Sequence, residues 1–343
     1  MPEGFDLGSF SMKDVSAAPL VSVLTPVHNG ARHLAECIDS ILAQTYQNWE
    51  CVIVDNCSTD ATANIAAAYT VKDARIRVCR TERLLSAATN HNFALTQMSV
   101  TSRYCKFVQA DDWLFPECLA RMVEVGEGHP SAGIIGAYCL DGDRVSLDGL
   151  PFQSTVVSGR DLGRATLLGQ LYVFGSPTSI MIRSELVRER PRLFDESAFP
   201  RHWDSPACLE LLRITDFGFV HQVLTHTRRP PDARTSVSKR LNSYWAEELA
   251  ALYRYGRLFL DPDELRERRR YHTARYYAYL GRNLLSRDDA FWSYHRQTLA
   301  SVGIRVSKLR FAVAAAADLV GRVLRPVRAA ALSVVRADGR RDL

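Results

Sequence analysis

The first third of the chain alternates short apolar runs with amphipathic segments, and this alternation constrains the fold more than any other feature. Apolar runs at 20–25, 49–54, 75–79 and 104–108 have the length and composition of buried strands. Between the first two runs, Leu34, Ile38 and Ile41 recur at helical spacing. Strands and helices that alternate across short connections predict a parallel sheet covered by helices on both faces.

Polar side chains directly follow three of the predicted strands. They are His28 and Asn29 after the first strand, Asp55 and Asn56 after the second, and Asp111 and Asp112 after the fourth. Right-handed crossovers bring the carboxyl ends of such strands to one edge of the sheet. Ligands of open α/β sheets bind beyond that edge, so we expect a polar ligand site there.

The rest of the chain divides into a second part of the sheet and a helical region. Residues 134–140, 178–183 and 217–220 are predicted to be strands, and 140–149 an exposed turn region. Residues 243–300 are predicted to be helical. We therefore expect an N-terminal extension at 1–18, a sheet domain at 19–235 and a helical appendage at 236–343 that ends in a basic tail.

The charge distribution limits the class of ligand that the chain can bind, and the cysteine content indicates its cellular compartment. The net charge is +5, and residues 301–343 hold nine basic and three acidic side chains, so the rest of the chain is nearly neutral. A neutral body argues against nucleic acid as the main ligand. The eight cysteines and an N-terminus without an apolar core predict reduced thiols in the cytoplasm.

The pair Asp111-Asp112 is the strongest candidate for chemistry. Carboxylates at the end of a buried strand need charge compensation, and a divalent cation such as Mg²⁺ or Mn²⁺ supplies it. Such a cation can bridge a diphosphate and offset the charge that develops when the diphosphate leaves. The alternative is that the pair caps a helix that begins near Pro116.

Asp55 is the second candidate, because it ends the apolar run at 49–54. A carboxylate at this place can accept a hydrogen bond from a ring N–H of a nucleotide base or from a ribose hydroxyl. The alternative is a plain cap of the helix that follows.

Three segments in this order resemble the family 2 glycosyltransferases: VSVLTPVHNG at 21–30, SILAQTYQNWECVIVDNCSTDAT at 40–62 and KFVQADDWLFPECL at 106–119. The resemblance covers residues 20–235. It implies a GT-A fold, the α/β sheet of nucleotide-diphospho-sugar transferases, and transfer of a sugar with inversion of configuration.

The resemblance also implies roles for single residues. The nucleotide pocket would be lined by Pro26, His28, Asn29, Asp55 and Asn90, with Asp55 on the base. The chain departs from the family pattern where His28 replaces a tyrosine and where Cys57 and Leu85 replace glycines.

The metal motif of the family, Asp-x-Asp, begins here with Gln109 and continues to Asp111 and Asp112. The resemblance implies that Asp111 and Asp112 hold a divalent cation, Mg²⁺ or Mn²⁺, and that Asp111 also serves the nucleotide. The loss of one negative charge at Gln109 predicts weaker cation binding.

The general base is expected in the segment 194–212. The resemblance favours Asp204, with Trp203 where the family often has a glutamate, and leaves Glu210 and Asp195 as lesser candidates. A carboxylate opposite the leaving diphosphate would deprotonate the acceptor hydroxyl. Alternatively, Asp204 caps a helix and Asp195 closes a turn.

Two basic features have an open interpretation. Arg228 or Arg229 would neutralise the diphosphate, or else belong to a solvated loop. Residues 309–325 place Val313, Ala317, Val320 and Leu324 on one helical face and Arg322 and Arg325 on another. Such a helix lies on an anionic membrane surface beside a lipid-linked acceptor, or docks on the protein itself.

The leading hypothesis is a metal-dependent inverting glycosyltransferase that uses a nucleotide-sugar, with UDP-sugars favoured as the commonest donors of the family. The acceptor would be a glycan or a lipid-linked glycan in cell-surface polysaccharide synthesis. The enzyme would be cytoplasmic or peripheral on the inner face of the membrane. One alternative is a catalytically impaired binding or assembly module. A sugar nucleotidyltransferase is disfavoured, because TPVHNG has only Gly30 in place of a glycine-rich phosphate loop.

Overall fold

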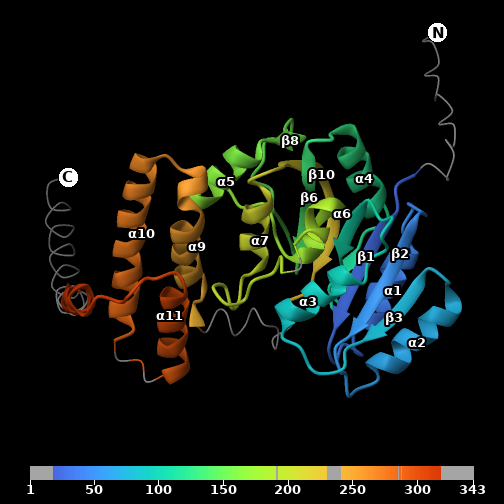
Figure 1. The fold of residues 1–343 in the computed structure, drawn as a ribbon, viewed down its shortest axis with the longest axis horizontal. Helices are drawn as coiled ribbons and strands as arrows, with labels where there is room; N and C mark the ends of the chain where they lie inside the picture. Colours follow the sequence, from blue (N-terminus) through green and yellow to red (C-terminus); the bar gives the residue numbers. More distant parts are fainter. Residues whose placement is uncertain (1–17, 191, 230–240, 285, 287, 318–343) are drawn as a thin grey trace, which may run out of the picture. The chain divides into compact units, whose positions relative to one another are not determined.

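The computed structural model describes residues 18–190, 192–229, 241–284, 286 and 288–317 (Figure 1). The chain forms two compact units. The first, here called the sheet unit, comprises Met1–Leu162, Leu171–Phe194 and Ala207–Arg229. The second, the helical unit, comprises Gly163–Gln170, Asp195–Pro206 and Pro230–Leu343.

The sheet unit is built on one mixed sheet with the strand order β3-β2-β1-β4-β9-β6-β10-β5, in which β7 pairs with β6 and β8 with β10. The strands are β1 (Val21–Val27), β2 (Trp49–Asp55), β3 (Ile76–Arg80), β4 (Tyr104–Phe107), β5 (Trp113–Leu114), β6 (Ala132–Asp141), β7 (Arg144–Ser146), β8 (Val156–Val157), β9 (Ile180–Arg183) and β10 (Asp216–Thr227). The first four strands of this order are parallel, which confirms the prediction from their alternation with helices.

The later strands differ from the sequence prediction in several places, and β10 in particular continues to Thr227, beyond the predicted end at residue 220. β9 runs antiparallel to both β4 and β6, and it begins at Ile180 rather than Thr178, which lies in the 3-10 helix η2 (Pro177–Ser179). The expected turn at 140–149 contains β7, which forms a hairpin with the end of β6.

The first strand is longer than predicted. We expected Pro26 to end it, but β1 continues to Val27. The pairing of β1 with β4 ends at Leu24 and Phe107, whereas the pairing with β2 continues to Val27 and Asp55. Proline is tolerated here because a missing N–H costs little where no neighbouring strand needs it.

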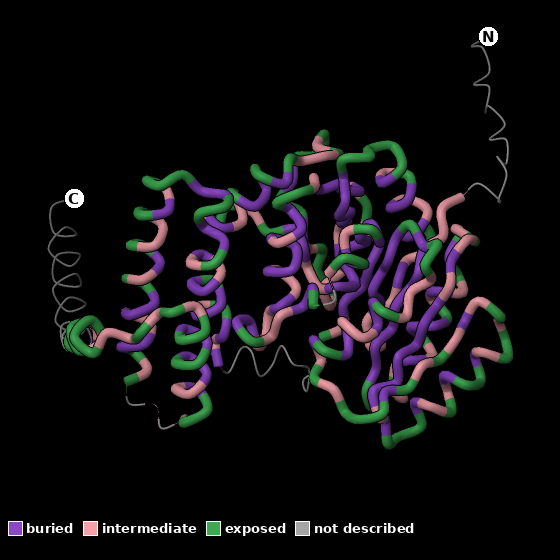
Figure 2. Tube along the Cα trace, viewed as in Figure 1, coloured by how far each residue is buried: buried purple, intermediate pink, exposed green. Residues whose placement is uncertain are grey.

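Helices cover both faces of the sheet. On one face, α1 (Leu34–Leu42), α2 (Thr62–Lys72) and α4 (Cys118–Gly128) share a core with alternate residues of β1, among them Val21 and Val23. On the other, α3 (Ala87–Thr96) lies against β1 and β2, and its His91 ring stacks on Phe107 with centroids 5.2 Å apart. Figure 2 shows the buried strands between exposed outer helix faces. This sandwich fixes the carboxyl ends of β1, β2 and β4 as a rigid edge.

Three further helices complete the described segments that connect the later strands. They are α5 (Gly159–Leu168), α6 (Ser184–Arg188) and α7 (Asp204–Leu211).

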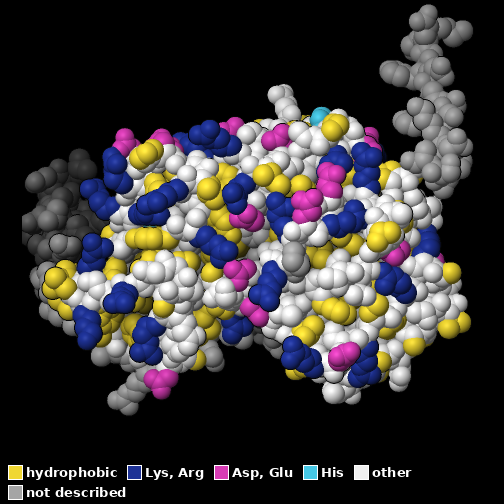
Figure 3. All heavy atoms as spheres, in the orientation of Figure 1, with side chains coloured by type: hydrophobic (Ala, Val, Ile, Leu, Met, Phe, Trp, Pro, Cys, Tyr) yellow, Lys and Arg dark blue, Asp and Glu magenta, His cyan; other side chains and the backbone are white. Residues whose placement is uncertain are grey.

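The helical unit is built from α9 (Tyr244–Phe259), α10 (Pro262–Arg282) and α11 (Asp289–Ser301). Its core is aromatic, and the Tyr276 hydroxyl lies 2.8 Å from Nδ1 of His295 inside it. Asp261 starts α10 with a capping box that also involves Glu264. Figure 3 shows Lys and Arg side chains among hydrophobic ones over the visible face of these helices. The helical appendage predicted from the sequence is confirmed.

The division of the chain is less simple than the single break that we expected at 235/236. Residues 163–170 and 195–206, which we assigned to the sheet domain, cluster with the helical unit. The reason is local contact, since Arg164 pairs with Glu264 and a Cβ on Gly163 would lie 2.4 Å from the Phe259 ring.

The C-terminal amphipathic segment is described only as far as Ala317. Phe311 packs edge-on against Trp292 at 5.7 Å, and Ala315 is buried, whereas Val313 is 62% exposed. The side that docks is therefore not the side that carries Val313. The predicted positions Val320, Arg322, Leu324 and Arg325 lie outside the described residues, as does the N-terminal extension except for residue 18. No helix of the described residues is both long and apolar enough to span a bilayer.

Candidate functional site

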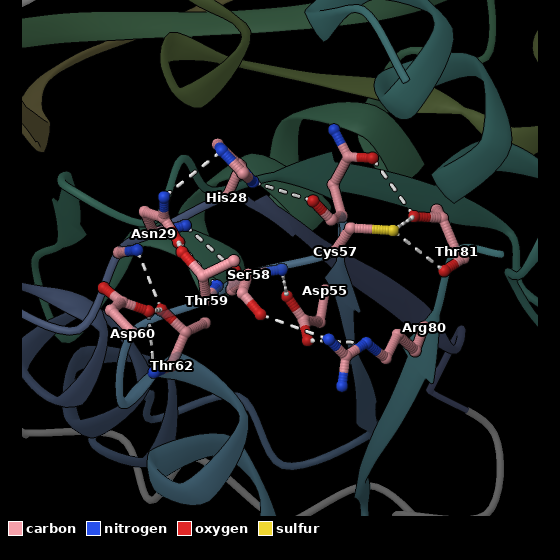
Figure 4. Close-up of polar contacts among 12 residues, drawn as sticks. His28, Asn29, Asp55, Cys57, Ser58, Thr59, Asp60, Thr62, Arg80 and Thr81 are labelled. Atoms are coloured by element: carbon pink, nitrogen blue, oxygen red, sulfur yellow. Dashed lines mark hydrogen bonds and ion pairs between the residues drawn. The ribbon is translucent and has the colours of Figure 1, made fainter. Parts of the chain in front are cut away.

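The loops that follow β1 and β2 are joined by hydrogen bonds (Figure 4). The amide of Asn29 donates to Ser58 Oγ at 2.9 Å, and Asn29 Oδ1 accepts from the amide of Thr59 at 2.8 Å. Nδ1 of His28 lies 2.8 Å from the carbonyl oxygen of Asn56. Because a carbonyl oxygen only accepts, Nδ1 carries the proton. His28 and Asn29 are thus held in place while both remain exposed to solvent.

Asp55 lies beside this network and is only 1% exposed. One carboxylate oxygen accepts from the amide of Ser58 at 2.9 Å, and the other lies 3.6 Å from Nε of Arg80. Asp55 does not cap the next helix, which was the alternative interpretation. Helix α2 begins at Thr62, whose amide donates to Asp60 at 3.0 Å. A buried carboxylate covered by a largely exposed arginine suits a polar ligand that competes for both groups.

Arg80 is a candidate ligand-binding residue that the sequence analysis missed. Its side chain is 59% exposed, and its guanidinium also donates to the carbonyl oxygen of Ser58 at 3.1 Å. Arg80 ends β3 and is the in-register partner of Asp55 in the parallel pair β2/β3. The sequence could have indicated this role, because Arg80 is a basic residue at the end of β3, the strand next to the one that Asp55 ends.

Asn56 fixes the third loop of this edge, the one between β3 and α3. Its amide group donates to the carbonyl oxygen of Leu85 at 2.9 Å and accepts from the Leu85 amide at 2.8 Å. Only the backbone of Leu85 takes part. This explains how the loop is held although leucine stands where the family pattern has glycine.

Cys57 occupies a backbone conformation that favours glycine. Its φ is +54°, in the left-handed region, where a side chain costs about 1–2 kcal/mol. Its Sγ donates to the Thr81 carbonyl oxygen at 3.2 Å, a weak bond that offsets part of this cost. The glycine of the family pattern is therefore explained by geometry.

Replacing Cys57 with glycine is expected to raise the free energy of unfolding by up to about 1 kcal/mol, because the left-handed strain is relieved. Urea unfolding measures this. Cys79→Gly is the control, since Cys79 lies in extended strand β3 and its replacement should lower stability. A loss of stability in Cys57→Gly as large as in the control would contradict the strain argument.

The two carboxylates after β4 differ in their surroundings. Asp112 is 2% exposed, and its oxygens accept from Thr178 Oγ1 at 2.7 Å and from the Arg228 amide at 3.0 Å. Burial, together with the neighbouring charge of Asp111, raises the pKa of Asp112 to about 7. Asp111 is half-buried, and burial raises the pKa of its carboxyl as well. Neither residue caps the next helix, because α4 starts at Cys118 and Glu117 precedes it as the cap.

This difference decides how the pair fits a divalent cation. Both oxygens of Asp112 already accept hydrogen bonds within the fold, so Asp112 supports the loop rather than facing a ligand. Asp111 is the better ligand, since its side chain is only partly buried, and a backbone hydrogen bond together with the charges of His33, Arg228 and Arg229 offsets part of the cost of burial. Among the described residues, no group of three or more His, Cys, Asp or Glu side chains is arranged to hold a metal ion. A cation at Asp111 would therefore take its other ligands from water and from a bound diphosphate.

Arg228 is built into the same edge. Its Nε donates to the Asp111 carbonyl oxygen at 3.1 Å, and its Nη2 donates to Glu36 at 2.6 Å. The guanidinium also lies 5.0 Å from the centre of the Trp113 ring. The interpretation as a solvated loop is wrong for Arg228, whose side chain is 27% exposed. Arg229 pairs with Asp141 at 2.7 Å.

The loop after β1 connects the Asp55 side of this edge with the Asp111 side. A Cβ on Gly30 would lie 3.4 Å from Cβ of Ala110, the residue before Asp111. Further along the loop, burial lowers the pKa of His33, and the charge of Arg228 lowers it further. The residues that precede α1 are thus close enough to Arg228, and to the opposing charges of Asp111 and Glu36, for these charges to act on them.

Pro26 and Asn90 lie apart from the exposed groups. Pro26 is buried within β1, and Asn90 on α3 is 4% exposed, with an Oδ1 that has no hydrogen-bond partner among the described residues. The structure therefore brings together His28, Asn29, Asp55, Asp111, Asp112 and Arg228 at one edge, and places these two in the interior.

Asp204 belongs to the helical unit, whereas the other candidates belong to the sheet unit. It is the first residue of α7, half-buried, and its Oδ1 accepts from the Ser205 amide at 2.9 Å. The two lesser candidates are engaged elsewhere. Asp195 closes a turn by accepting from the Ser197 amide at 3.0 Å, as expected, and Glu210 pairs with Arg213 at 2.5 Å.

Comparisons with known proteins identify the family of the chain. The profile described as Glycosyl transferase family 2 matches residues 22–190. The uncharacterized glycosyltransferase RT0329 of Rickettsia typhi is 31% identical over 248 residues, which are 71% of this chain and 73% of that protein. The chain belongs to glycosyltransferase family 2.

Two relatives from Bacillus subtilis match a shorter segment. The putative teichuronic acid biosynthesis glycosyltransferase TuaG is 33% identical over 138 residues, which are 40% of this chain and 52% of TuaG. The putative glycosyltransferase EpsE is 34% identical over 138 residues, covering 39% of this chain and 48% of EpsE. The chain thus spans about half the length of these two relatives.

Solved structures confirm the GT-A fold. Residues 1–349 of S. aureus TarS superpose with a TM-score of 0.58 at 16% identity, covering 83% of this chain and 80% of that chain. The mannosyltransferase PcManGT from Pyrobaculum calidifontis, solved with GDP-Man and Mn²⁺, has a TM-score of 0.54 at 17% identity. That match covers 92% of this chain and 84% of PcManGT.

Proposed function

We propose that this glycosyltransferase moves a sugar from a nucleotide-diphospho-sugar to a hydroxyl of a glycan or lipid-linked acceptor, with inversion at the anomeric carbon. The observation that carries the proposal is the placement of exposed His28, buried Asp55 and half-buried Asp111 along one edge of the sheet. This edge offers a polar contact for a base and, further along, charges for a diphosphate.

The nucleotide would occupy the side of this edge formed by the loops after β1 and β2. Asp55 would accept an N–H of the base, displacing or sharing the Arg80 guanidinium that now lies 3.6 Å away. The His28 ring, anchored through Nδ1, would present its face and its Nε2 to the nucleotide. TarS has been crystallised with UDP-GlcNAc and PcManGT with GDP-Man, and we favour UDP for this chain.

The diphosphate would lie at the side formed by Asp111 and Arg228. Asp111 would hold a divalent cation, Mg²⁺ or Mn²⁺, which offsets the negative charge of the diphosphate as it leaves. The chemistry of the site fits, because carboxylate oxygens are preferred ligands of these ions and the Asp111 side chain is only partly buried. Arg228 is already oriented by Glu36 and by the Asp111 carbonyl.

Asp204 is the proposed general base. A carboxylate that accepts the proton of the acceptor hydroxyl promotes attack on the face opposite the leaving diphosphate, and one such displacement inverts the anomeric carbon. The acceptor class is inferred from relatives such as TuaG, which is named for teichuronic acid biosynthesis. If the acceptor is lipid-linked, the basic residues of 301–343 would favour the anionic inner face of a membrane.

A donor screen tests this function. The purified chain is incubated with UDP-, GDP- and dTDP-sugars, with Mn²⁺ or with EDTA, and with a bacterial membrane extract as acceptor, and the released nucleotide is measured. We expect release from one class of donor, dependent on Mn²⁺ and increased by the extract. Nucleotide binding without any release would instead support the catalytically impaired module, and release unaffected by EDTA would contradict the cation.

A further inference from the structure

A buried glutamate of the helical unit holds the segment that leads into α7. Glu247 on α9 is 3% exposed. Its carboxylate accepts from the backbone amides of Arg201 at 3.0 Å and His202 at 2.8 Å, and from the Tyr294 hydroxyl of α11. These three donors come from two separate parts of the unit, so one carboxylate ties the 201–202 backbone to both α9 and α11.

The same segment has further anchors on α9. Nε2 of His202 lies 2.8 Å from Ser243 Oγ, and the His202 ring stacks on Tyr244 with centroids 3.9 Å apart. Upstream, Asp195 pairs with Arg254 at 2.9 Å. Trp203, which directly precedes Asp204, is buried. The segment before Asp204 is therefore held by contacts at residues 195, 201 and 202 and by the burial of Trp203.

Packing alone does not require a carboxylate at this position. An apolar side chain would fill the space without the cost of removing a charge from water. Backbone amides, in contrast, need an acceptor, and a single ionised carboxylate satisfies two of them in fixed directions. Asp204 is also close enough for its charge to act on Glu247. Glu247 thus supplies a second carboxylate near Asp204, whereas the sequence neighbours Trp203 and Ser205 carry none.

We propose that Glu247 is a positioning residue for Asp204. The ionised carboxylate of Glu247 fixes the backbone of Arg201 and His202, and it thereby fixes the direction in which the chain enters α7 at Asp204. This inference rests on the proposed function, in which Asp204 is the base. Glu247 itself is too deeply buried to touch an acceptor.

The positioning depends on pH. A protonated Glu247 is neutral, and it accepts the hydrogen bonds of the Arg201 and His202 amides more weakly than the ionised carboxylate does, so the segment loosens. The titratable groups that act on it are Asp204 of the 195–206 segment, through its charge, and Tyr294 of α11, through its hydroxyl, whereas Arg201 and His202 reach it with their backbone amides. Burial and, to a smaller extent, the charge of Asp204 raise the pKa of Glu247, and the three hydrogen-bond donors oppose this, with the result that the pKa is about 7. The transfer rate should therefore rise with pH through neutrality, as the carboxylate ionises.

The test compares Glu247→Gln with Tyr294→Phe, which removes one donor and leaves the carboxylate in place. Glu248→Gln is the matched control, because Glu248 is the next residue of α9 and its side chain is 60% exposed. For each variant, kcat and KM are measured between pH 6 and 8 with the best donor from the screen. Nucleotide affinity and hydrogen exchange of the Arg201 and His202 amides are measured as well.

For Glu247→Gln we expect kcat to fall about 100-fold, since misplacement by about 1 Å costs roughly that much. Donor KM and nucleotide affinity should stay within twofold, the rise of kcat with pH should disappear, and exchange of both amides should increase at least tenfold. Tyr294→Phe should lose less kcat and keep the pH dependence, and Glu248→Gln should match the unmodified chain.

Unchanged kcat and pH dependence in Glu247→Gln would overturn the proposal, as would a fall in nucleotide affinity proportional to the fall in kcat. If Glu247→Gln does not fold, Tyr294→Phe decides, and its unchanged kcat together with unchanged amide exchange would overturn the proposal. If the proposed function itself is wrong, the unmodified chain releases no nucleotide from any donor. The amide exchange of Arg201 and His202 still reports the contact with Glu247 in that case, so the two failures are distinguishable.

Discussion

Asp204→Asn is expected to lower the rate of sugar transfer by about 10²–10⁴-fold, the usual contribution of a general base. An asparagine keeps the size of the side chain and its place at the start of α7, but it does not accept the proton of the acceptor hydroxyl. Donor KM and nucleotide affinity should stay within about twofold, since the proposed contacts to the nucleotide are made by other residues. Steady-state transfer assays and nucleotide titration measure the two effects.

Glu210→Gln is the control for Asp204→Asn. Glu210 lies on the same helix, is a lesser candidate for the base, and is paired with Arg213 at 2.5 Å. Its replacement should leave the transfer rate near that of the unmodified chain. Full transfer in Asp204→Asn, or a larger loss in Glu210→Gln, would remove Asp204 from the mechanism.

Asp111→Asn is expected to lower transfer by about 10²–10³-fold and to raise donor KM. The carboxylate is the proposed ligand of the cation that offsets the diphosphate charge, and loss of one electrostatic contact to the leaving group has an effect of about this size. Folding should not suffer, because replacing Asp111 removes a partly buried charge whose pKa is raised by burial. Thermal unfolding without ligand measures the stability, and the transfer assay at several Mn²⁺ concentrations measures the activity.

Asp141→Asn serves as the matched control for Asp111→Asn. Asp141 ends β6, pairs with Arg229, and has a 31% exposed side chain. Its removal also takes one negative charge from the sheet unit, so equal losses in both variants would show that net charge, rather than a cation ligand, causes the effect.

The strand order and site edge show how far the sequence alone reaches. The parallel strands β1 to β4 were predictable, because short runs rich in apolar residues alternate with helical segments across short connections. The convergence of His28, Asp55 and Asp111 follows from this topology, since Asp55 ends β2, His28 directly follows β1, and Asp111 lies in the loop after β4. The resemblance of three segments to family 2 glycosyltransferases added the chemistry.

The remaining features depend on contacts between distant parts of the chain, which local patterns do not encode. The difference between Asp111 and Asp112 comes from Thr178 and the Arg228 amide, which reach Asp112 from η2 and from the end of β10. Glu247 looks like an ordinary helix residue in the sequence, and only the fold brings the amides of Arg201 and His202 to it. The short β7 was missed because LDGDRVSLDG carries turn residues on both sides of three strand positions.

The central claim is that Asp111 holds a divalent cation together with the diphosphate of the donor. It is tested most directly by titrating Mn²⁺ into the unmodified chain and into Asp111→Asn, with and without UDP, while electron paramagnetic resonance measures free Mn²⁺. We predict that the unmodified chain binds about one Mn²⁺ only when UDP is present, and that Asp111→Asn binds at least tenfold more weakly. Equal Mn²⁺ binding by both proteins in the presence of UDP would contradict this account.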